Sequence, residues 1–539
     1  MKKTTAACLV ALVLVFRAPA NAAQEPGGPA DSLGAVDFPV SCSSRAQAAF
    51  DRAMALLHHM TYPRARAAFG KVTEMDPSCA MAHWGVAMTL FQPLWPTRPG
   101  PDDIRRGREE IRQARALGRL SERERLFLEA GAAFFREPDS ADYWERIRGW
   151  QEGMERAHTA LPRDPEAAAW LALAILAGAP TGATREQSDR AAELLLDVYR
   201  QNRNHPGAMH YLIHADDMPG RERESPEVVE RYQTVAPRNP HALHMPTHIY
   251  TRLGEWKPVI QGNLRAAEAA LEHPAGSEGQ LVWDEFPHAI EYLVYAYLQT
   301  GADDSALVQL RRLRRTARLE PTFKTAFHLA STPARYALER HAWAEAMSLK
   351  ARDPASLDWD RFAWPEAVTW FARGLGAAHE GRLDRARAAG VRLGELEAAA
   401  GGSNEAVFAR QIGVLRLALG GWVAHVDDEP DSAVALMRQA ADLESGTPKP
   451  AVTPGATIPA HELLGDLFLE RKRPAEALAA YRRSLELYPH RLNSLLGAAR
   501  AARADGEVSL AAAYYRQVLA LAGGGSRTSV VREARGFLE

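Results

Sequence analysis

The sequence predicts an all-α protein, a solenoid of stacked helix pairs, from its composition, its length and a repeated spacing. Ala, Leu, Arg and Glu dominate the 539 residues while Val and Ile are sparse, a mixture that favours helices over strands. The chain is also longer than a single compact core usually supports, which favours a repeat array. An array requires a recurrent pattern, and the C-terminal region contains one.

The clearest repeat lies near the C-terminus. Ala477 and Ala511 are 34 residues apart, as are Tyr481 and Tyr515, and Pro489 follows the second helix of the first unit. Small residues where two helices cross, an aromatic residue one turn later and a proline at the exit are typical of tetratricopeptide repeats. Such a helix pair cannot bury its apolar face alone, so successive units are expected to stack into a superhelix.

Glycines mark the turns of further units. Gly220, Gly254, Gly301 and Gly381 are each expected just after a first helix, because glycine readily adopts the left-handed conformation that ends many helices. Gly220 and Gly254 are again 34 residues apart, whereas Gly254 and Gly301 are 47 residues apart. The polar stretch 273–279 accounts for the excess and predicts an insertion between two units.

Both ends and one internal stretch fall outside the repeat pattern. Residues 445–460 are rich in proline and threonine and predict a linker in front of the C-terminal repeats. The expected divisions are a signal peptide at 1–22, an extended arm at 23–41, a long solenoid at 42–444, the linker at 445–460, a C-terminal repeat pair at 461–521 and a tail at 522–539.

The N-terminus has the pattern of an export signal. Lys2 and Lys3 precede an apolar run at 6–16, and the sequence Ala-Asn-Ala at 20–22 forms a small-residue cleavage site. The run is too short to cross a bilayer, and no later stretch approaches the roughly 20 apolar residues that a membrane helix needs. We therefore expect a periplasmic or secreted protein without a membrane span.

Cleavage of this signal leaves two cysteines, Cys42 and Cys79. An even count in an oxidising compartment predicts a disulfide between them. A buried pair of free thiols is the alternative.

Histidines occur in two pairs that the repeat relates to each other. His210 and His214, and likewise His244 and His248, have the spacing i, i+4, which places both imidazoles on one face of a helix. The second pair follows the first at a distance of 34 residues, so the pairs are expected to lie side by side on successive units. Pro246 falls inside the second helix and predicts a bend between the two histidines.

The turns also indicate which residues face the concave groove. In tetratricopeptide repeats the inward positions of the first helix recur at i, i+3, i+7 and i+10, counted here back from each turn. This count from Gly220, Gly254, Gly301 and His341 gives His210, His214 and Asp217, then His241, His244 and His248, then His288, Glu291 and Tyr295, then His328 and Arg335.

These groups predict a transition-metal site in the groove. Histidine combined with carboxylate is a ligand set for copper, zinc or iron, and imidazole alone does not distinguish among them. One four-nitrogen site and a two-metal site are both geometrically open. The expected metal ligands are His210, His214, Asp217, His244, His248 and His288.

Other groove residues are expected to contact a substrate or orient a ligand. Glu291 or Glu285 suits the role of a partner for a ligand nitrogen, or of a base toward a metal-bound water. Arg335 and Tyr295 suit an anionic or oxygen-rich substrate. The expected substrate-binding residues are His241, Glu291, Tyr295, His328 and Arg335.

Two other functions use the same groove. One is a scaffold that binds an extended peptide or an envelope protein without metal, and the other is a metal chaperone or store that catalyses no reaction. The sequence contains no phosphate loop, nucleophile elbow, paired CxxC or HExxH motif, so it does not favour the common hydrolase and nucleotide-binding functions. The formal net charge of −2 provides no field to attract nucleic acid. Whether the protein is an enzyme is left open.

Several segments together resemble a family of large exported bacterial tetratricopeptide proteins. They include HPGAMHYLIHADD, PHALHMPTHIYTRLGEW and HAIEYLVYAYLQTG, together with the stretch from SCSSRAQAAF to CAMAHWGVAM. The resemblance covers most of residues 40–345 and implies a solenoid that bears a dedicated site. It does not imply a substrate. The sequence departs from the family pattern after His214, which leaves Asp217 a better match to the family's acidic residue than Asp216.

Overall fold

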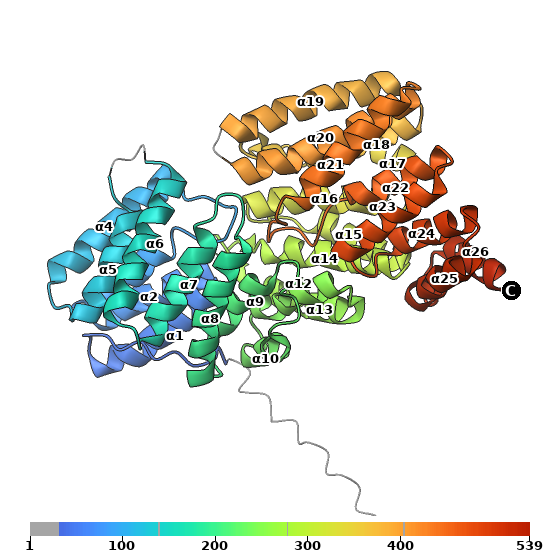
Figure 1. Cartoon of the computed structure of the whole chain (residues 1–539). Coiled ribbons are helices and arrows are strands. Elements are labelled where there is room, and N and C mark those ends of the chain that lie inside the picture. Colours follow the sequence, from blue (N-terminus) through green and yellow to red (C-terminus); the bar gives the residue numbers. More distant parts are fainter. Residues whose placement is uncertain (1–31, 138–140, 277–278, 403–404) are drawn as a thin grey trace, which may run out of the picture.

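The computed structural model describes residues 32–539 apart from 138–140, 277–278 and 403–404. The expected signal peptide and the first part of the expected arm lie outside the described residues. Within the described part, the helices α1 to α26 pack mainly against their neighbours in the chain, so the molecule is an all-α helical solenoid of the tetratricopeptide type (Figure 1).

The first third of the chain forms regular helix pairs whose ends are set by local sequence. Ser121 caps α5 by accepting the Glu124 N–H, and the Glu124 carboxylate accepts the Ser121 N–H in return. Asp164 caps α7, in which Pro165 occupies the first position. These helices are α1 (Ser44–His58), α2 (Tyr62–Met75), α3 (Ala80–Met88), α4 (Pro101–Leu117), α5 (Glu122–Phe134), α6 (Tyr143–Ala160), α7 (Pro165–Ala177) and α8 (Arg185–Gln201).

The central helices carry the insertion that the glycine spacing predicts. Two short antiparallel strands lie on either side of residues 276–280, with Pro274 paired to Val282 and Ala275 paired to Leu281. The central elements are α9 (Pro206–Asp216), α10 (Pro226–Val235), α11 (Pro240–His244), α12 (Pro246–Leu253), α13 (Trp256–Leu271), β1 (Pro274–Ala275), β2 (Leu281–Val282), α14 (Glu285–Gln299), α15 (Asp303–Arg315) and α16 (Phe323–Leu338).

The C-terminal helices show why the repeat needs small residues. A Cβ atom added at Gly497 would lie 2.3 Å from the ring of Tyr481, so only glycine lets the two helices approach this closely. The elements are α17 (Trp343–Met347), η1 (Trp359–Arg361), α18 (Ala363–His379), α19 (Leu383–Gly402), α20 (Ala406–Val426), α21 (Pro430–Ser445), α22 (Ala460–Glu470), α23 (Pro474–Leu487), α24 (Leu492–Ala504), α25 (Val508–Ala522) and α26 (Thr528–Leu538).

The turn residues have the backbone conformation that the repeat register requires. Gly220, Gly254 and Gly301 have φ angles of 82°, 67° and 64°, and Gly381 has 66°. His341 occupies the equivalent position with a φ of 53°. This left-handed conformation carries a steric cost for a residue with a Cβ, which explains why glycine fills most of these turns.

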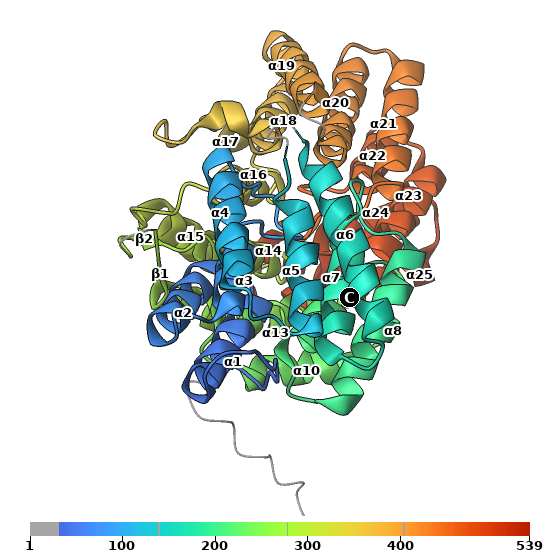
Figure 2. The ribbon, with the colours of Figure 1, turned by 90° about the vertical axis from the view of Figure 1, so that its left-hand side faces the viewer.

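The solenoid curls until its C-terminal repeats pack against its centre. Helix α24 contacts α14, and the Trp256 indole donates a hydrogen bond of 3.0 Å to the His490 carbonyl. The fully buried Arg491 forms ion pairs of 2.7 Å with both Glu339 and Glu462. Figure 2 shows α19 to α21 above the N-terminal helices in this curled arrangement.

The expected linker lies inside the groove. We call residues 446–459, between α21 and α22, the inner segment. Val452, Thr453 and Ile458 are buried, and the backbone carbonyls of residues 455–457 accept hydrogen bonds from Arg335. The groove that the sequence predicts is therefore partly filled by the chain itself.

Cys42 and Cys79 form a disulfide between the start of the solenoid and the N-terminus of α3. The preceding residues, 32–41, form neither helix nor strand and lie against the first repeats, with Phe38 fully buried and its ring 5.0 Å from that of Phe127. The disulfide and Phe38 fasten this stretch of backbone to the repeats.

One helix among the described residues, α20, is long and apolar enough to cross a membrane by length and composition alone. Half of its most apolar window is buried inside the protein, and the helix packs against both α19 and α21. Its apolar character is accounted for by this buried position in the solenoid core.

Candidate metal centre

The inward-facing histidines converge from five helices. α9, α11, α12, α14 and α16 present their first-helix faces to the interior of the curl, as the glycine register predicts. Most of these histidine side chains are buried, and their ring nitrogens point at one another rather than at solvent. Six of the seven form two groups of three, and the seventh, His328 on α16, lies against His288.

The first group, which we call triad A, consists of His210, His214 and His241. His210 and His214 occupy adjacent turns of α9, with their Nε2 atoms 3.2 Å apart. His241, from α11, brings its Nε2 atom within 2.9 Å of the His210 Nε2 atom. One ligand atom from each of the three residues lies within 4.8 Å of the others.

The second group, triad B, consists of His244, His248 and His288. Pro246 ends one helix and starts the next, because α11 stops at His244 and α12 begins at Pro246 with only Met245 between them. The break leaves the His244 and His248 Nε2 atoms 2.9 Å apart. His288 from α14 completes the group, with its ring centre 4.2 Å from that of His244.

Outer partners fix the tautomers of His244 and His248. The Asn263 amide nitrogen donates to the Val259 carbonyl, so the Asn263 Oδ1 atom faces His244 and accepts its Nδ1–H at 2.7 Å. The Asp217 carboxylate can only accept, and it takes the His248 Nδ1–H at 2.9 Å. Both Nδ1 atoms therefore carry the proton, and both Nε2 atoms present a lone pair.

His288 is oriented through a relay. Its Nδ1 atom lies 2.9 Å from the Nε2 atom of His328, and the His328 Nδ1–H donates to Glu291 at 2.5 Å. Since His328 donates through Nδ1, its Nε2 atom accepts the proton of His288. The Nε2 atom of His288 is then the lone-pair nitrogen that it offers to triad B.

Triad A is arranged in the same way at His210. The His210 Nδ1–H donates to the His58 backbone carbonyl at 2.6 Å, so its Nε2 atom presents a lone pair. His241 places its own Nε2 atom 2.9 Å from that of His210. The His241 Nδ1 atom lies 3.2 Å from a Glu285 carboxylate oxygen without forming a hydrogen bond.

Two lone pairs at this distance repel unless a cation lies between them. A proton is one such cation, but burial and the neighbouring imidazoles hold the pKa well below its ordinary value for four of the histidines. These four are His210, His214, His244 and His288. Burial also lowers the pKa of His248, against the opposing effect of Asp217. The neutral, lone-pair form is the one that binds metal ions.

The carboxylates around the triads are balanced by cations. Burial alone would raise the pKa of Asp217, but Lys449 at 3.0 Å and Arg252 at 2.5 Å hold it well below its ordinary value. Lys324 acts in the same way on Glu285, which it contacts through its ammonium group. The interior therefore accommodates several carboxylates without a net negative charge.

A third cluster lies beside triad A. The buried Glu166 accepts hydrogen bonds from the Nε2 atoms of His58 at 2.9 Å and His205 at 3.1 Å, and the two histidines lower its pKa. His58 also contacts the Tyr211 hydroxyl through Nδ1 at 3.0 Å. All of these nitrogens have hydrogen-bonding partners, so the cluster is a complete hydrogen-bond network. It holds His58 in place, and the His58 carbonyl in turn accepts the hydrogen bond from His210.

The arrangement differs from the sequence prediction at several positions. Asp217, expected as a metal ligand, faces His248 Nδ1 and orients that ring instead, because it is held by Lys449 and Arg252. His241, expected to bind substrate, completes triad A.

The other expected substrate-binding residues make contacts within the protein. Glu291 and His328 form the relay behind His288. Arg335 and Tyr295 are buried against the inner segment and the C-terminal repeats, with Arg335 stacked over the Tyr295 ring. Glu291, His328 and Arg335 support the site from behind, whereas Tyr295 also lines the cavity beside triad A.

Three important groups were not found from the sequence. Asn263 lies on the buried face of α13 among Val259, Gly262 and Ala266, and an amide in such a stripe is the signal that could have identified it. Glu166, within the apolar helix α7, gives a signal of the same kind. Lys449 gave none, because its stretch reads as a linker.

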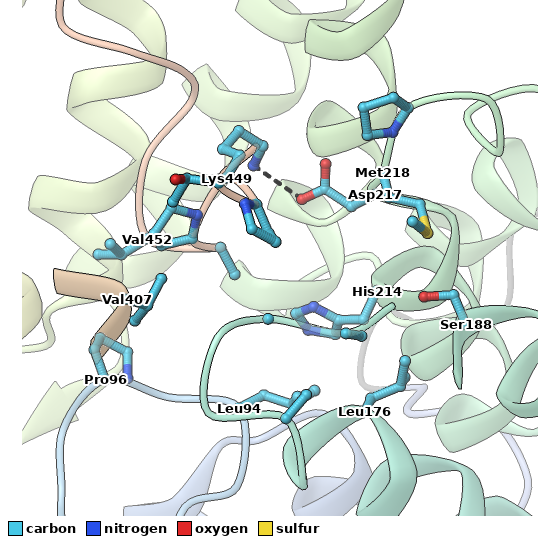
Figure 3. Close-up of a pocket in the computed structure, with 18 of the residues that line it drawn as sticks. Leu94, Pro96, Leu176, Ser188, His214, Asp217, Met218, Val407, Lys449 and Val452 are labelled. Atoms are coloured by element: carbon cyan, nitrogen blue, oxygen red, sulfur yellow. Dashed lines mark hydrogen bonds and ion pairs between the residues drawn. The ribbon is translucent and has the colours of Figure 1, made fainter. Parts of the chain in front are cut away.

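A cavity of about 410 Å³ opens beside triad A. His214 projects into its wall, and Asp217 and Lys449 meet in an ion pair at its edge (Figure 3). Further parts of the wall come from α6 and α7, from the turn after α3, from α12 to α14, from the start of α20 and from the inner segment. The cavity gives a small molecule access to one of the two triads.

Comparisons with known proteins identify no relative from which a function could be transferred. No family model matches the sequence, and no curated protein matches it. Among solved structures, one that aligns is a chain in the crystal structure of the APC/C hetero-tetramer Cut9–Hcn1. It is 14% identical, the alignment covers 91% of this chain and 96% of that chain, and the TM-score is 0.29.

Proposed function

We propose that this protein is an exported tetratricopeptide-type solenoid that binds two transition-metal ions, one in triad A and one in triad B. The observation that carries the proposal is the Nε2–Nε2 contact of 2.9 Å between His244 and His248, whose outer acceptors leave a lone pair on both atoms. His210 and His241 form a second Nε2–Nε2 contact of 2.9 Å. A bound cation converts such a contact into two coordinate bonds. Copper, zinc and iron all accept imidazole ligands.

The spacing of the nitrogens supports this assignment. Two nitrogens bound to one tetrahedral zinc ion at about 2.0–2.1 Å are about 3.3 Å apart. The Nε2 distances of 2.9 and 3.2 Å within triad A, and of 2.9 Å within triad B, are close to that value. Small rotations of the rings would bring the nitrogens to coordination distance.

The outer hydrogen bonds support it as well. Histidines that bind metal usually donate their second ring N–H to a carboxylate, a carbonyl or another acceptor, which fixes the tautomer. Asn263, Asp217 and the His58 carbonyl occupy these positions. Histidines that only filled space in a core would not require such a consistent set of acceptors.

Two ions fit the arrangement better than one. Each triad supplies three ligand nitrogens that lie within 4.8 Å of one another. Most ring centres within a triad are 4.2–4.9 Å apart, the exception being His248 and His288 at 6.1 Å. The His214 and His248 ring centres are 6.2 Å apart, and those of His241 and His244 are 6.3 Å apart. Three protein ligands leave a further coordination position, as catalytic metal sites do.

The exported location rests on the signal-peptide pattern of residues 1–22 and accords with the disulfide between Cys42 and Cys79. In an oxidising compartment the two cysteines are paired and leave the histidines as the metal ligands. The protein then acts as a metal-dependent enzyme or as a metal store, and the open coordination position next to a cavity favours the enzyme.

Metal analysis of the purified full-length protein tests the proposal. We expect about two equivalents of metal per chain after reconstitution with copper, zinc or iron and removal of loose ions. His210→Ala should reduce the content to about one equivalent through loss of triad A, and His244→Ala should do the same through loss of triad B. The double variant should bind almost none, with unchanged helix content by circular dichroism.

His83→Ala is the matched control, because His83 pairs with Glu110 on the N-terminal repeats and lies in neither triad. It should keep both equivalents. A wild-type content below about 0.1 equivalent with every metal would refute the proposal, as would unchanged metal content in the double variant.

A peptide-binding scaffold is the alternative function, and one observation favours it. The inner segment shows that the interior can hold extended backbone, since Arg335 binds its carbonyls at 455–457. An external peptide would have to displace this segment. A peptide captured with equal affinity in the presence and absence of chelator would support the scaffold, whereas the metal proposal predicts no such capture.

A further inference from the structure

The cavity beside triad A has the properties of a binding site for a small molecule. Its volume of about 410 Å³ lies within the range of sites that hold small ligands. The labelled side chains in Figure 3 surround a common space, with Leu94 and Leu176 below it, Val407 and Val452 on the left and Met218 at the upper right.

Aromatic rings and prolines form much of the described cavity wall. Rings of this kind offer flat apolar faces on which another ring stacks, and proline presents its ring carbons in a similar way. The aromatic lining residues are Trp95, Tyr143, Trp144, Trp256, Tyr295, Phe408 and Tyr488, and the prolines are Pro96, Pro180, Pro219, Pro448, Pro450 and Pro454.

The cationic side chains of the described wall are already paired. Lys449 and Arg252 both bind Asp217, at 3.0 and 2.5 Å. Arg98 binds Glu405 at 2.9 Å and lies over the Tyr143 ring at 4.0 Å. A charged ligand would have to break one of these pairs or remain unpaired in an apolar space, and either is costly.

The acidic side chains of the wall are also satisfied. Asp217 has the partners given above, and the Glu444 carboxylate accepts the backbone N–H of Ala460 at 2.9 Å. Burial raises the pKa of Glu444 to about 7, so this carboxyl is only partly ionised near neutral pH. Neither group is left to attract a cationic ligand.

The cavity also leads to the metal site. Among the described residues, His214 is the triad side chain that lines it, and it is the partly exposed member of triad A. Trp95, another residue of the cavity wall, also lies beside His241 of triad A, with the two ring centres 5.8 Å apart. A ligand in the cavity would lie against the open side of triad A.

We propose that this cavity binds an uncharged aromatic small molecule as the substrate that is presented to the metal ion of triad A. The inference rests on the proposed function for the metal ion, whereas binding in the cavity depends only on the wall. The two can therefore be tested separately.

Fluorescence titration with phenylnaphthylamine tests the cavity on metal-free, full-length protein. We expect saturable binding of one molecule per chain. Anilinonaphthalene sulfonate, which has the same rings with an added anionic group, should bind at least about tenfold more weakly because its charge finds no free partner. Equal binding of the two probes would overturn the assignment of an uncharged ligand.

Val407→Trp should block the cavity, since Val407 lines it at the edge of the solenoid core. The control is Val391→Trp on α19, where the side chain is 66% exposed and lies outside the cavity. Met218→Trp fills the cavity from another wall and replaces the first variant if that one misfolds. Unchanged phenylnaphthylamine binding in a folded cavity variant would overturn the proposal.

Copper loading tests the link to triad A. Bound Cu²⁺ should quench the probe in wild-type protein, and His210→Ala, which removes a ligand of triad A that does not line the cavity, should weaken the quenching while keeping the probe bound. Probe binding without any metal uptake would contradict the proposed function and the substrate role but leave the cavity site intact. Metal uptake without probe binding would contradict the cavity site and leave the proposed function intact.

Discussion

Asp216 and Asp217 are neighbours in sequence but serve different parts of the molecule. Asp216 turns away from the histidines and pairs with Arg221 at 2.9 Å, whereas Asp217 accepts the Nδ1–H of His248. Outer hydrogen bonds of the second kind raise the basicity of a ligand and hold its ring in place. The two residues therefore provide a matched pair for a test of the outer contacts.

Asp217→Asn should lower the metal affinity of triad B by about 10- to 100-fold, the usual effect of losing a carboxylate behind a histidine ligand. The affinity of triad A should change less. Competition with a chelator of known affinity, followed by metal analysis, measures both. Asp216→Asn is the control, because it removes the charge of another buried carboxylate that pairs with a cation, so it should lower stability but not metal affinity. An equal loss of metal affinity in the two variants would contradict the role of Asp217.

At the residue scale the sequence predicted which histidines converge but only part of what each one does. The 34-residue register brought His210, His214, His244 and His248 to one face because repeat geometry is local. The register could not show whether Asp217 is itself a metal ligand or a residue that orients a histidine ligand. That distinction depends on Lys449, which is 232 residues away in sequence and 3.0 Å away in space.

At the scale of elements, the inner segment is the main departure from the predicted organisation. Its composition of proline, threonine and glycine is typical of an exposed linker, and the sequence shows no periodicity that would indicate burial. Its position is set by Arg335, which is fully buried and donates to three of its carbonyls. The same arginine pairs with Glu291, which supports His328 and, through it, His288.

Arg335→Met should release the inner segment and destabilise the protein by about 3–5 kcal/mol, because the buried Glu291 loses its cation. Limited proteolysis should then cut within 446–459, which we expect to be resistant in the wild type, and denaturant unfolding gives the free energy. Arg340→Met is the control, since Arg340 pairs with Glu345 at the surface and should contribute under about 1 kcal/mol. A resistant segment in Arg335→Met would show that other contacts hold it.

At the scale of the whole molecule, the closure of the solenoid could not be read from the sequence. Each repeat contacts mainly its neighbours, so the sequence pattern predicts stacking, whereas the curvature is the sum of many small rotations. That sum brings Arg491 between Glu339 and Glu462, which come from two different parts of the array. The sequence does not identify Arg491 as a closing contact, because an arginine between two helices is common.

Arg491→Met should open the curled solenoid at a cost of about 3 kcal/mol or more, because it leaves Glu462 buried without this cation and leaves Glu339 with only the longer contact to Arg335, at 3.9 Å. Small-angle scattering should show a larger radius of gyration, and amide exchange should rise in α24, where it faces α14. Arg500→Met removes a half-exposed pair with Glu533 and should leave the radius unchanged. An unchanged radius in Arg491→Met would mean that apolar packing alone holds the closure.

The inner segment has a mechanical consequence for the metal centre. Open repeat arrays are flexible, and the distances between ligands on neighbouring repeats would change as the array bends. In this protein the inner segment runs through the interior of the curled solenoid. It is bound to Asp217 at one end and to Arg335 at the other, and these contacts hold the surrounding helices at a fixed separation. We therefore expect the distances between the histidine ligands of each triad to stay nearly constant when an ion leaves or changes oxidation state. The reorganisation energy of the site should then be small.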